Sequence, residues 1–304
     1  MLLLPPFWAG LAVPITALYW VLAVLLLGLS RGCLPALRPL TTYGRRRKDA
    51  SPSPPLWGRG SLPHSLGFTL FYATGLLSCT TTTTTLLPTP PATHLLLLLL
   101  YTTHLARRLL ECRYTHRFTP RPMPLLHWAA GTSFYVMAPL TMVLSLPAMA
   151  PDWDTVLQHW GRYCTALYLY VFGSVVQHLS HRTLAQLPKN PEDPSEGVPT
   201  GGLFQYVWCP HYFAECLLYL GWYLCCPSSL LMGLMLLFVV VNLSLTAHDS
   251  RECYVRQWEE WRRRWCLPPQ GEEETEMVGA GAGGKPGPGR SVSGVGRRRW
   301  KGHM

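Results

Sequence analysis

The sequence predicts an all-α fold, a polytopic membrane bundle of about seven transmembrane helices. Hydrophobic residues make up 48% of the 304 residues and charged residues only 14%, whereas charged residues are about 25% of an average soluble domain. The apolar residues gather in long uncharged stretches at 7–29, 123–150 and 216–247, which excludes disorder throughout the chain. The basic residues, 26 against 16 acidic, lie in short clusters between apolar blocks. This distribution disfavours a soluble enzyme and a nucleic-acid-binding protein.

A membrane-spanning helix needs about 20 mostly apolar residues. Seven candidate spans follow one another along the chain, at 7–29, 64–87, 93–112, 124–148, 161–184, 203–225 and 228–247. We read the first as a retained span and not a cleaved signal peptide, because it lacks a basic start and its apolar run is too long. The second is weakened by the run Thr80–Thr85. The third carries Arg107 and Arg108, which we expect to snorkel toward the membrane surface.

The loops give an independent prediction of sidedness, because cytosolic loops are enriched in Lys and Arg. Alternate loops and the segment after the last span hold the basic residues, which include Arg45, Arg46, Arg47, Lys48, Arg59, Arg113, Arg117, Arg121, Lys189, Arg251, Arg256 and Arg262–Arg264. The other loops hold either no basic residue or the acidic Asp152 and Asp154. Seven spans with the N-terminus outside the cytosol and the C-terminus inside satisfy every loop.

The composition also divides the chain. We expect residues 1–92 to hold the first two spans and a basic loop, residues 93–268 to carry the functional region, and residues 269–304 to be a low-complexity disordered tail. The ten cysteines show no paired metal-binding spacing, so we expect reduced packing residues and no metal centre.

Ionisable residues within spans are costly and are therefore candidate functional residues. In the third span, spacings of four and three place His104, Arg108 and Glu111 on one helix face. An interfacial Arg–Glu pair that ends the helix explains these residues as well as a functional site does. In the fifth span, Gln177 and His181 share a face, and a solvated helix end is the alternative explanation.

The sixth span is more informative. His211 and Glu215 lie one turn apart, and an apolar run up to Leu224 follows Glu215. An unpaired carboxylate there would be expensive, which favours a ligand-binding role for Glu215 over a structural one. Asn242 lies near the end of the last span, and Arg251 and Tyr254 follow that span. Arg251 and Tyr254 suit a phosphate and a ribose, although an amphipathic helix on the lipid headgroups would use the same segment.

Over residues 93–268 these motifs resemble the steroid 5α-reductase family, and more narrowly its polyprenol (polyprenal) reductase branch. Arg107-Arg-Leu-Leu-Glu111-Cys-Arg-Tyr114 is similar to the branch's R-R-x-x-E-x-x-Y. The segment Gly202-Leu-Phe-Gln-Tyr-Val-Trp-Cys-Pro-His-Tyr-Phe-Ala-Glu215 is similar to the family's long G-L-F-x-Y-V-x-x-x-N/H-x-x-x-E. Shorter likenesses are Gln177-x-x-x-His181, Ser250-Arg251-Glu-Cys-Tyr254 and Tyr43-Gly44-Arg45.

The chain also departs from the family pattern. His211 stands where steroid-reducing members have Asn, which favours the polyprenol branch. Cys253 replaces a Trp, and Pro188 replaces an Arg that would help to bind phosphate.

The resemblance implies a seven-helix enzyme of the endoplasmic reticulum membrane that binds NADPH at the cytosolic end of its bundle. Carried over by position, the cofactor residues would be Gln177, His181, Tyr206, His211, Glu215, Asn242, Arg251 and Tyr254. The residues facing the substrate would be Glu111, His104 and Tyr135. The implied partners are a long-chain isoprenoid lipid substrate and membrane lipids, with the product feeding dolichol-dependent protein glycosylation. We expect a monomer.

Chemistry favours an unsaturated aldehyde as the substrate, because hydride attack on a carbon–carbon double bond needs a neighbouring electron sink. Polyprenal would then accept hydride at its β-carbon while an acid polarises the aldehyde oxygen. His104 or a protonated Glu111 is the candidate acid.

Other classes stay open at this point. They are a 3-oxo-steroid 5α-reductase, a membrane isoprenylcysteine-type methyltransferase, a di-iron hydroxylase and a non-enzymatic transporter or scaffold. The hydroxylase is disfavoured, because His178 and His181 form one pair where such sites use several His boxes.

Overall fold

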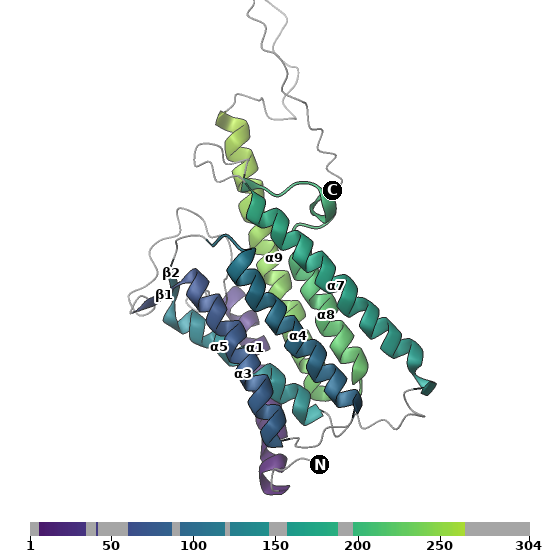
Figure 1. Ribbon diagram of the computed structural model, residues 1–304. Helices are drawn as coiled ribbons and strands as arrows, with labels where there is room; N and C mark the ends of the chain where they lie inside the picture. The colour runs from purple at the N-terminus through teal and green to yellow at the C-terminus, as the bar shows by residue number, and fades with distance from the viewer. Residues whose placement is uncertain are drawn as a thin grey trace, which may run out of the picture.

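The computed structural model describes residues 6–34, 41, 60–86, 92–118, 122–145, 157–187 and 197–264. In this part of the chain seven long helices run side by side as one bundle, from which the end of the last helix projects (Figure 1). They are α1 (Pro6–Arg31), α3 (His64–Leu86), α4 (Ala92–Tyr114), α5 (Leu125–Ser145), α7 (Trp160–Gln186), α8 (Pro210–Cys225) and α9 (Leu230–Arg264). The prediction of a mostly helical fold is therefore confirmed.

Two of these helices are long and apolar enough to cross a bilayer by length and composition, over Gly10–Arg31 and Leu230–Glu259. The seven-span topology and the sidedness of the termini stay predictions. Several predicted features lie outside the described residues, namely Tyr43-Gly44-Arg45, the other basic residues of the first loop, Arg121, Asp152, Asp154, Pro188, Lys189 and the tail 269–304.

The threonine run does not interrupt α3, which continues to Leu86. Its hydroxyls bond back to carbonyl oxygens one turn earlier; for example, the Thr81 hydroxyl donates to Leu77 O at 2.8 Å and the Thr85 hydroxyl donates to Thr81 O at 2.7 Å. A hydroxyl that is satisfied within its own helix no longer has to find water. The run is therefore compatible with a buried or lipid-facing helix.

The helix of the sixth predicted span, 203–225, starts later than predicted. A 3-10 helix, η4 (Gly202–Gln205), comes first, and α8 begins at Pro210. Gly201 and Gly202 have φ of +87° and +53°, a conformation that glycine adopts at little cost. Pro210 suits the first turn of a helix because its missing N–H would be unsatisfied there in any case. The loop thus delivers His211 and Glu215 on the first turns of α8.

The last helix is longer than the predicted span 228–247. α9 continues without a break from Leu230 to Arg264, so the segment after residue 247 is not a separate amphipathic helix. No Gly or Pro lies between residues 234 and 264 to end it. Arg31 at the end of α1 forms a bidentate ion pair with Asp249 of α9, both N···O distances being 2.6 Å. This pair joins the first and last helices at the end of the bundle that also holds the site.

A two-stranded antiparallel ribbon lies at the same end. β1 (Ser61–Pro63) pairs with β2 (Pro122–Pro124) in the register Leu62 to Met123. The ribbon joins the segments that precede α3 and α5.

None of the nine described cysteines forms a disulfide within the described part of the chain. Cys79 and Cys226 are buried as predicted, whereas Cys164 is exposed on α7.

Helices α7 and α8 pack closely because glycines lie at their contact. A Cβ on Gly173 of α7 would come within 2.9 Å of the Ala214 carbonyl oxygen, and one on Gly221 of α8 within 2.9 Å of the Ala166 carbonyl oxygen. Backbone atoms cannot rotate away as a side chain can. This close approach holds Gln177 on α7 against Glu215 on α8.

We therefore expect Gly173→Ala to lower the free energy of unfolding by about 1–3 kcal/mol, the usual cost of overpacking a core. Gly161→Ala in the same helix is the matched control, since a Cβ there meets nothing within 4 Å, and we expect it to leave stability unchanged or slightly higher. Thermal unfolding of both variants in detergent measures the difference, and equal midpoints would contradict the packing argument.

Candidate functional site

The described residues enclose a cavity of about 500 Å³ at the ribbon end of the bundle, a size within the usual range for small-molecule sites. All seven helices contribute to its wall. Its apolar part comes mainly from α1, α3, α5 and α9, and includes Leu22, Leu26, Phe71, Phe134, Phe238 and Leu243. Its polar part comes mainly from α4, α7, α8 and α9, and includes Arg108, Gln177, His181, His211, Glu215 and Asn242. The cavity is thus apolar along one side and polar along the other.

Six of the predicted site residues line this cavity. They are Tyr135, Gln177, His181, His211, Glu215 and Asn242. His104, Glu111, Tyr206, Arg251 and Tyr254 do not line it. The two groups are positioned by different contacts.

Glu215 is the centre of the polar wall. One carboxylate oxygen accepts a hydrogen bond from the Gln177 amide nitrogen, and the other lies 3.5 Å from Nε2 of His104. Gln177 also accepts a hydrogen bond from Arg107 through its amide oxygen, which fixes the orientation of the amide. His104 is 2% exposed and packs edge-on against Trp222, with ring centroids 5.4 Å apart. His104 therefore supports Glu215 from behind and does not reach the cavity.

Glu111 is held still more firmly. Arg107 donates to Oε1 at 2.6 Å, Arg108 donates to Oε2, and Nδ1 of His178 lies 2.9 Å from Oε1. The Glu111 side chain is 3% exposed. Two guanidinium groups around one carboxylate favour its ionised form. Glu111 thus serves here as an acceptor within a buried ion-pair network.

The prediction that both arginines snorkel is wrong for Arg108, which is 6% exposed and points into the bundle. Besides its ion pair with Glu111, its Nε and Nη2 lie 3.2 and 3.0 Å from the Tyr72 hydroxyl on α3. Tyr72 is 4% exposed and lines the cavity beside Tyr135, with ring centroids 5.3 Å apart. Sequence reasoning missed Tyr72, since nothing in an apolar span marks one tyrosine among several.

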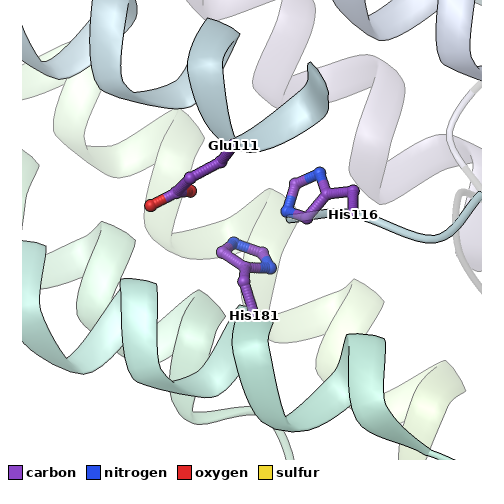
Figure 2. A group of neighbouring side chains, drawn as sticks. All are labelled: Glu111, His116 and His181. Atoms are coloured by element: carbon purple, nitrogen blue, oxygen red, sulfur yellow. The ribbon is translucent and has the colours of Figure 1, made fainter. Parts of the chain in front are cut away.

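A second missed residue is His116, which follows the end of α4. Figure 2 shows His116, His181 and Glu111 converging, and their possible ligand atoms lie within 4.8 Å of one another. The imidazoles of His116 and His181 are 4.5 Å apart between centroids, and that of His211 lies 5.3 Å from His181. The one sequence signal is the four-residue spacing from Cys112 to His116, whose Sγ and Nδ1 are 3.7 Å apart.

The surroundings of this cluster favour neutral imidazoles over a metal centre. Both oxygens of Glu111 already accept hydrogen bonds from arginine. Burial, and then the charge of Arg108, lower the pKa of His116 to about 4. A dication would have to displace the arginines and would add charge beside them.

The low pKa of His116 predicts a pH dependence of stability. The unfolded chain takes up this proton near the ordinary pKa of 6.5, whereas the folded chain resists it down to about pH 4. Stability is therefore lost as the pH falls from about 6.5 to about 4. We expect His116→Gln to lose less stability over this window than the wild type, as measured by thermal unfolding at pH 7.5 and 4.5. His248→Gln, at an exposed position, is the control and should follow the wild type; identical pH profiles for all three proteins would contradict the argument.

Three predicted cofactor residues lie away from the cavity. Tyr206 is 83% exposed in the loop before α8. Arg251 is exposed on α9, and its guanidinium lies 5.7 Å from the centroid of the Trp208 ring. Tyr254, one turn further along, is 5% exposed. The Arg251–Trp208 contact joins the loop before α8 to α9 at the end of the bundle.

Comparison with known proteins agrees with the motifs. Residues 121–269 match the family described as 3-oxo-5-alpha-steroid 4-dehydrogenase. Over this region the chain belongs to the steroid 5α-reductase family. The predicted family is thereby confirmed, and the matched region carries all eight predicted cofactor residues, from Gln177 to Tyr254.

The curated relatives of this family member include polyprenal reductases from animals and plants. The chain is 32% identical to the polyprenal reductase of Danio rerio over 159 residues, which cover 50% of this chain and 51% of the relative. It is 29% identical to that of Xenopus laevis over 174 residues, 52% of each chain. It is 25% identical to polyprenal reductase 2 of Oryza sativa subsp. japonica over 193 residues, 54% of each chain. The chain thus spans about half the length of the curated relatives it matches.

Proposed function

We propose that this protein is an NADPH-dependent reductase that reduces the α-isoprene double bond of polyprenal. The observation that carries the proposal is the two-sided cavity, in which a wall of buried polar groups around Glu215 faces an apolar wall from α1, α3 and α5. A dinucleotide headgroup needs the first wall and an isoprenoid needs the second. The names of the relatives, polyprenal reductases, support the same substrate class.

We further propose that all seven helices cross the membrane of the endoplasmic reticulum, with the N-terminus in the lumen. Large apolar side chains are exposed along helix faces that face outward, for example Leu18 (56%) and Leu25 (53%) on α1, and Val175 (52%) and Leu179 (54%) on α7. Soluble monomers rarely expose such faces. Basic residues lie at the end of the bundle where α4, α7 and α9 finish, among them Arg113, Arg117, Arg182 and Arg256, which suits a cytosolic surface.

The residues present fit a reduced nicotinamide. The Nδ1 atom of His211 is buried and has no hydrogen-bond partner among the described residues, and such an atom is costly unless a ligand or water meets it. Gln177, Glu215 and Asn242 offer amide and carboxylate groups on the same wall. We assign these four residues and His181 to the nicotinamide and its ribose. Tyr206, Arg251 and Tyr254, nearer the cytosolic surface, would hold the rest of the dinucleotide.

The substrate headgroup would lie between this wall and Tyr135, with the isoprenoid chain along the apolar helices. Bound NADPH would supply a hydride to the β-carbon of the enal. Tyr135 stacks on Phe71 with ring centroids 5.6 Å apart, so its position in the wall is fixed. Since α1 and α3 supply much of the apolar wall, this proposal would add both helices to the functional region predicted at residues 93–268.

The product, a saturated isoprenoid aldehyde, would serve dolichol synthesis for protein N-glycosylation. A steroid 5α-reductase is the second candidate, favoured by the description of the matching family. The volume and apolar lining of the cavity admit a steroid as well. The replacement of the steroid reductases' Asn by His211 favours the isoprenoid.

The test is an assay of the purified full chain in detergent or nanodiscs with NADPH. Polyprenal, polyprenol and a 3-oxo-Δ4 steroid are compared as substrates, with NADPH consumption and saturated product both measured. We expect turnover of polyprenal well above that of the other two. Binding of S-adenosylmethionine in place of NADPH would instead indicate a methyltransferase, and binding of neither cofactor would indicate a transporter or scaffold.

A further inference from the structure

The Tyr72 hydroxyl is held by a buried arginine, Arg108. Tyr72 and Arg108 both line the cavity, and the contact between them ties the phenol to the buried ion pair of Arg108 and Glu111. Arg108 contributes two nitrogen atoms to the phenol oxygen, at 3.2 and 3.0 Å, and its other terminal nitrogen is bound to Glu111. A guanidinium bonded on both sides in this way cannot rotate freely. The phenol oxygen is therefore held in one position.

This contact also orients the phenol proton. Arginine can only donate hydrogen bonds, so the Tyr72 oxygen must be the acceptor in both contacts with Arg108. Its own O–H then points away from the guanidinium. Tyr72 and Tyr135 both line the cavity, and Glu215 lines its polar wall. A donor that lines the cavity next to a positive charge is suited to an oxygen atom that becomes negative during a reaction.

The two acids favoured by the sequence do not share this geometry. His104 and Glu111 do not line the cavity. The His104 imidazole faces the Glu215 carboxylate, and the Glu111 carboxylate is surrounded by Arg107, Arg108 and His178. Neither group has access to a substrate without dismantling the network that holds it.

We infer that Tyr72 is the proton donor to the substrate's carbonyl oxygen. Arg108 is the positioning residue, which orients this phenol and places a positive charge beside it. The inference rests on the proposed function and adds a residue to it. His104 and Glu111 become supporting residues, which hold Glu215 and Arg108 in place.

Reduced nicotinamide, when bound, would supply the hydride for a new C–H bond at the β-carbon of the enal, and the electron pair of the carbon–carbon double bond would shift toward the carbonyl oxygen. That oxygen takes the Tyr72 proton and the substrate becomes an enol. The enol then gains a proton at its α-carbon and its oxygen returns a proton to Tyr72. One hydride and one proton are consumed for each saturated aldehyde formed.

The first test is Tyr72→Phe in the full chain, assayed with polyprenal and NADPH. We expect kcat/KM to fall about 100- to 1,000-fold, within the range for loss of a general acid or an oxyanion donor, with most of the loss in kcat and NADPH binding unchanged. Tyr101→Phe is the matched control. Tyr101 is fully buried on α4 and does not line the cavity, so we expect wild-type kinetics.

The second test measures proton transfer directly. Incorporation of 2,3-difluorotyrosine at position 72 makes the phenol more acidic and leaves its shape nearly unchanged. The titratable groups that act on Tyr72 are Arg108 and Cys112 on α4, Tyr135 on α5 and Glu215 on α8, and none of them is altered. We expect the high-pH limb of kcat/KM to move to lower pH.

The outcomes separate the two proposals. If the wild type binds NADPH but reduces none of the unsaturated carbonyls, the proposed function fails. If the wild type reduces polyprenal and Tyr72→Phe does so at an equal rate, or if the fluorinated protein keeps the wild-type pH profile, the proposed function stands and the role of Tyr72 is overturned. A Tyr72→Phe protein that has lost NADPH binding would also overturn it, since the residue would then be structural.

Discussion

Glu215→Gln should reduce NADPH-dependent turnover of polyprenal by about 100-fold. The Glu215 carboxylate accepts a hydrogen bond from Gln177 and faces His104 at 3.5 Å. A glutamine amide at this position would place its NH₂ group against either the Gln177 amide nitrogen or Nε2 of His104. Loss of one buried, charge-assisted contact costs about 3 kcal/mol, which corresponds to about two powers of ten in rate.

Kinetics and NADPH titration of the purified variant measure this effect, with Glu252→Gln as the matched control. Glu252 lies on the exposed surface of α9 with 47% of its side chain accessible, so the same substitution there should leave turnover unchanged. Wild-type kinetics for Glu215→Gln would remove the main support for the cofactor assignment.

Arg108→Met is expected to destabilise the fold far more than Arg107→Met, although the two residues are neighbours on α4. The Arg108 side chain is 8% exposed and that of Arg107 is 23% exposed. Removal of Arg108 takes away the buried donor to Oε2 of Glu111 and to the Tyr72 oxygen, at a cost of about 3 kcal/mol. Loss of the more exposed Arg107 should cost about 1 kcal/mol, because water can replace part of its contact with Glu111.

Thermal unfolding in detergent compares the two variants. The double variant Arg108→Met with Glu111→Gln should recover part of the lost stability, since removing both charges leaves neither one unpaired. Equal effects of the two arginine variants, or an additive double variant, would show that the network does not act as a unit.

Much of the architecture could be predicted from the sequence alone. Long uncharged blocks define where helices lie, because a bilayer or a bundle interior leaves the backbone no other way to satisfy its hydrogen bonds. The four- and three-residue spacings of His104, Arg108 and Glu111 placed them on one face, which local helix geometry fixes without tertiary information. The long motif around His211 and Glu215 identified the family.

Local patterns were less informative at helix ends and polar runs. The Thr80–Thr85 run looked like a weakness, but its hydroxyls are satisfied by their own helix. α9 extends past the predicted end at residue 247 because no helix-breaking residue follows. In both places the local backbone geometry, and not the proportion of apolar residues in the segment, decides the outcome.

The packing of the helices against one another sets which polar groups face the cavity and which face one another. Helix spacing places Glu111 and Arg108 on the same face but does not say that Tyr72 of another helix receives Arg108 there. Likewise, the meeting of Gln177 with Glu215 depends on how closely α7 and α8 approach at Gly173 and Gly221. A buried charge takes its role from the partners that packing brings to it, and those partners come from helices far apart in the sequence.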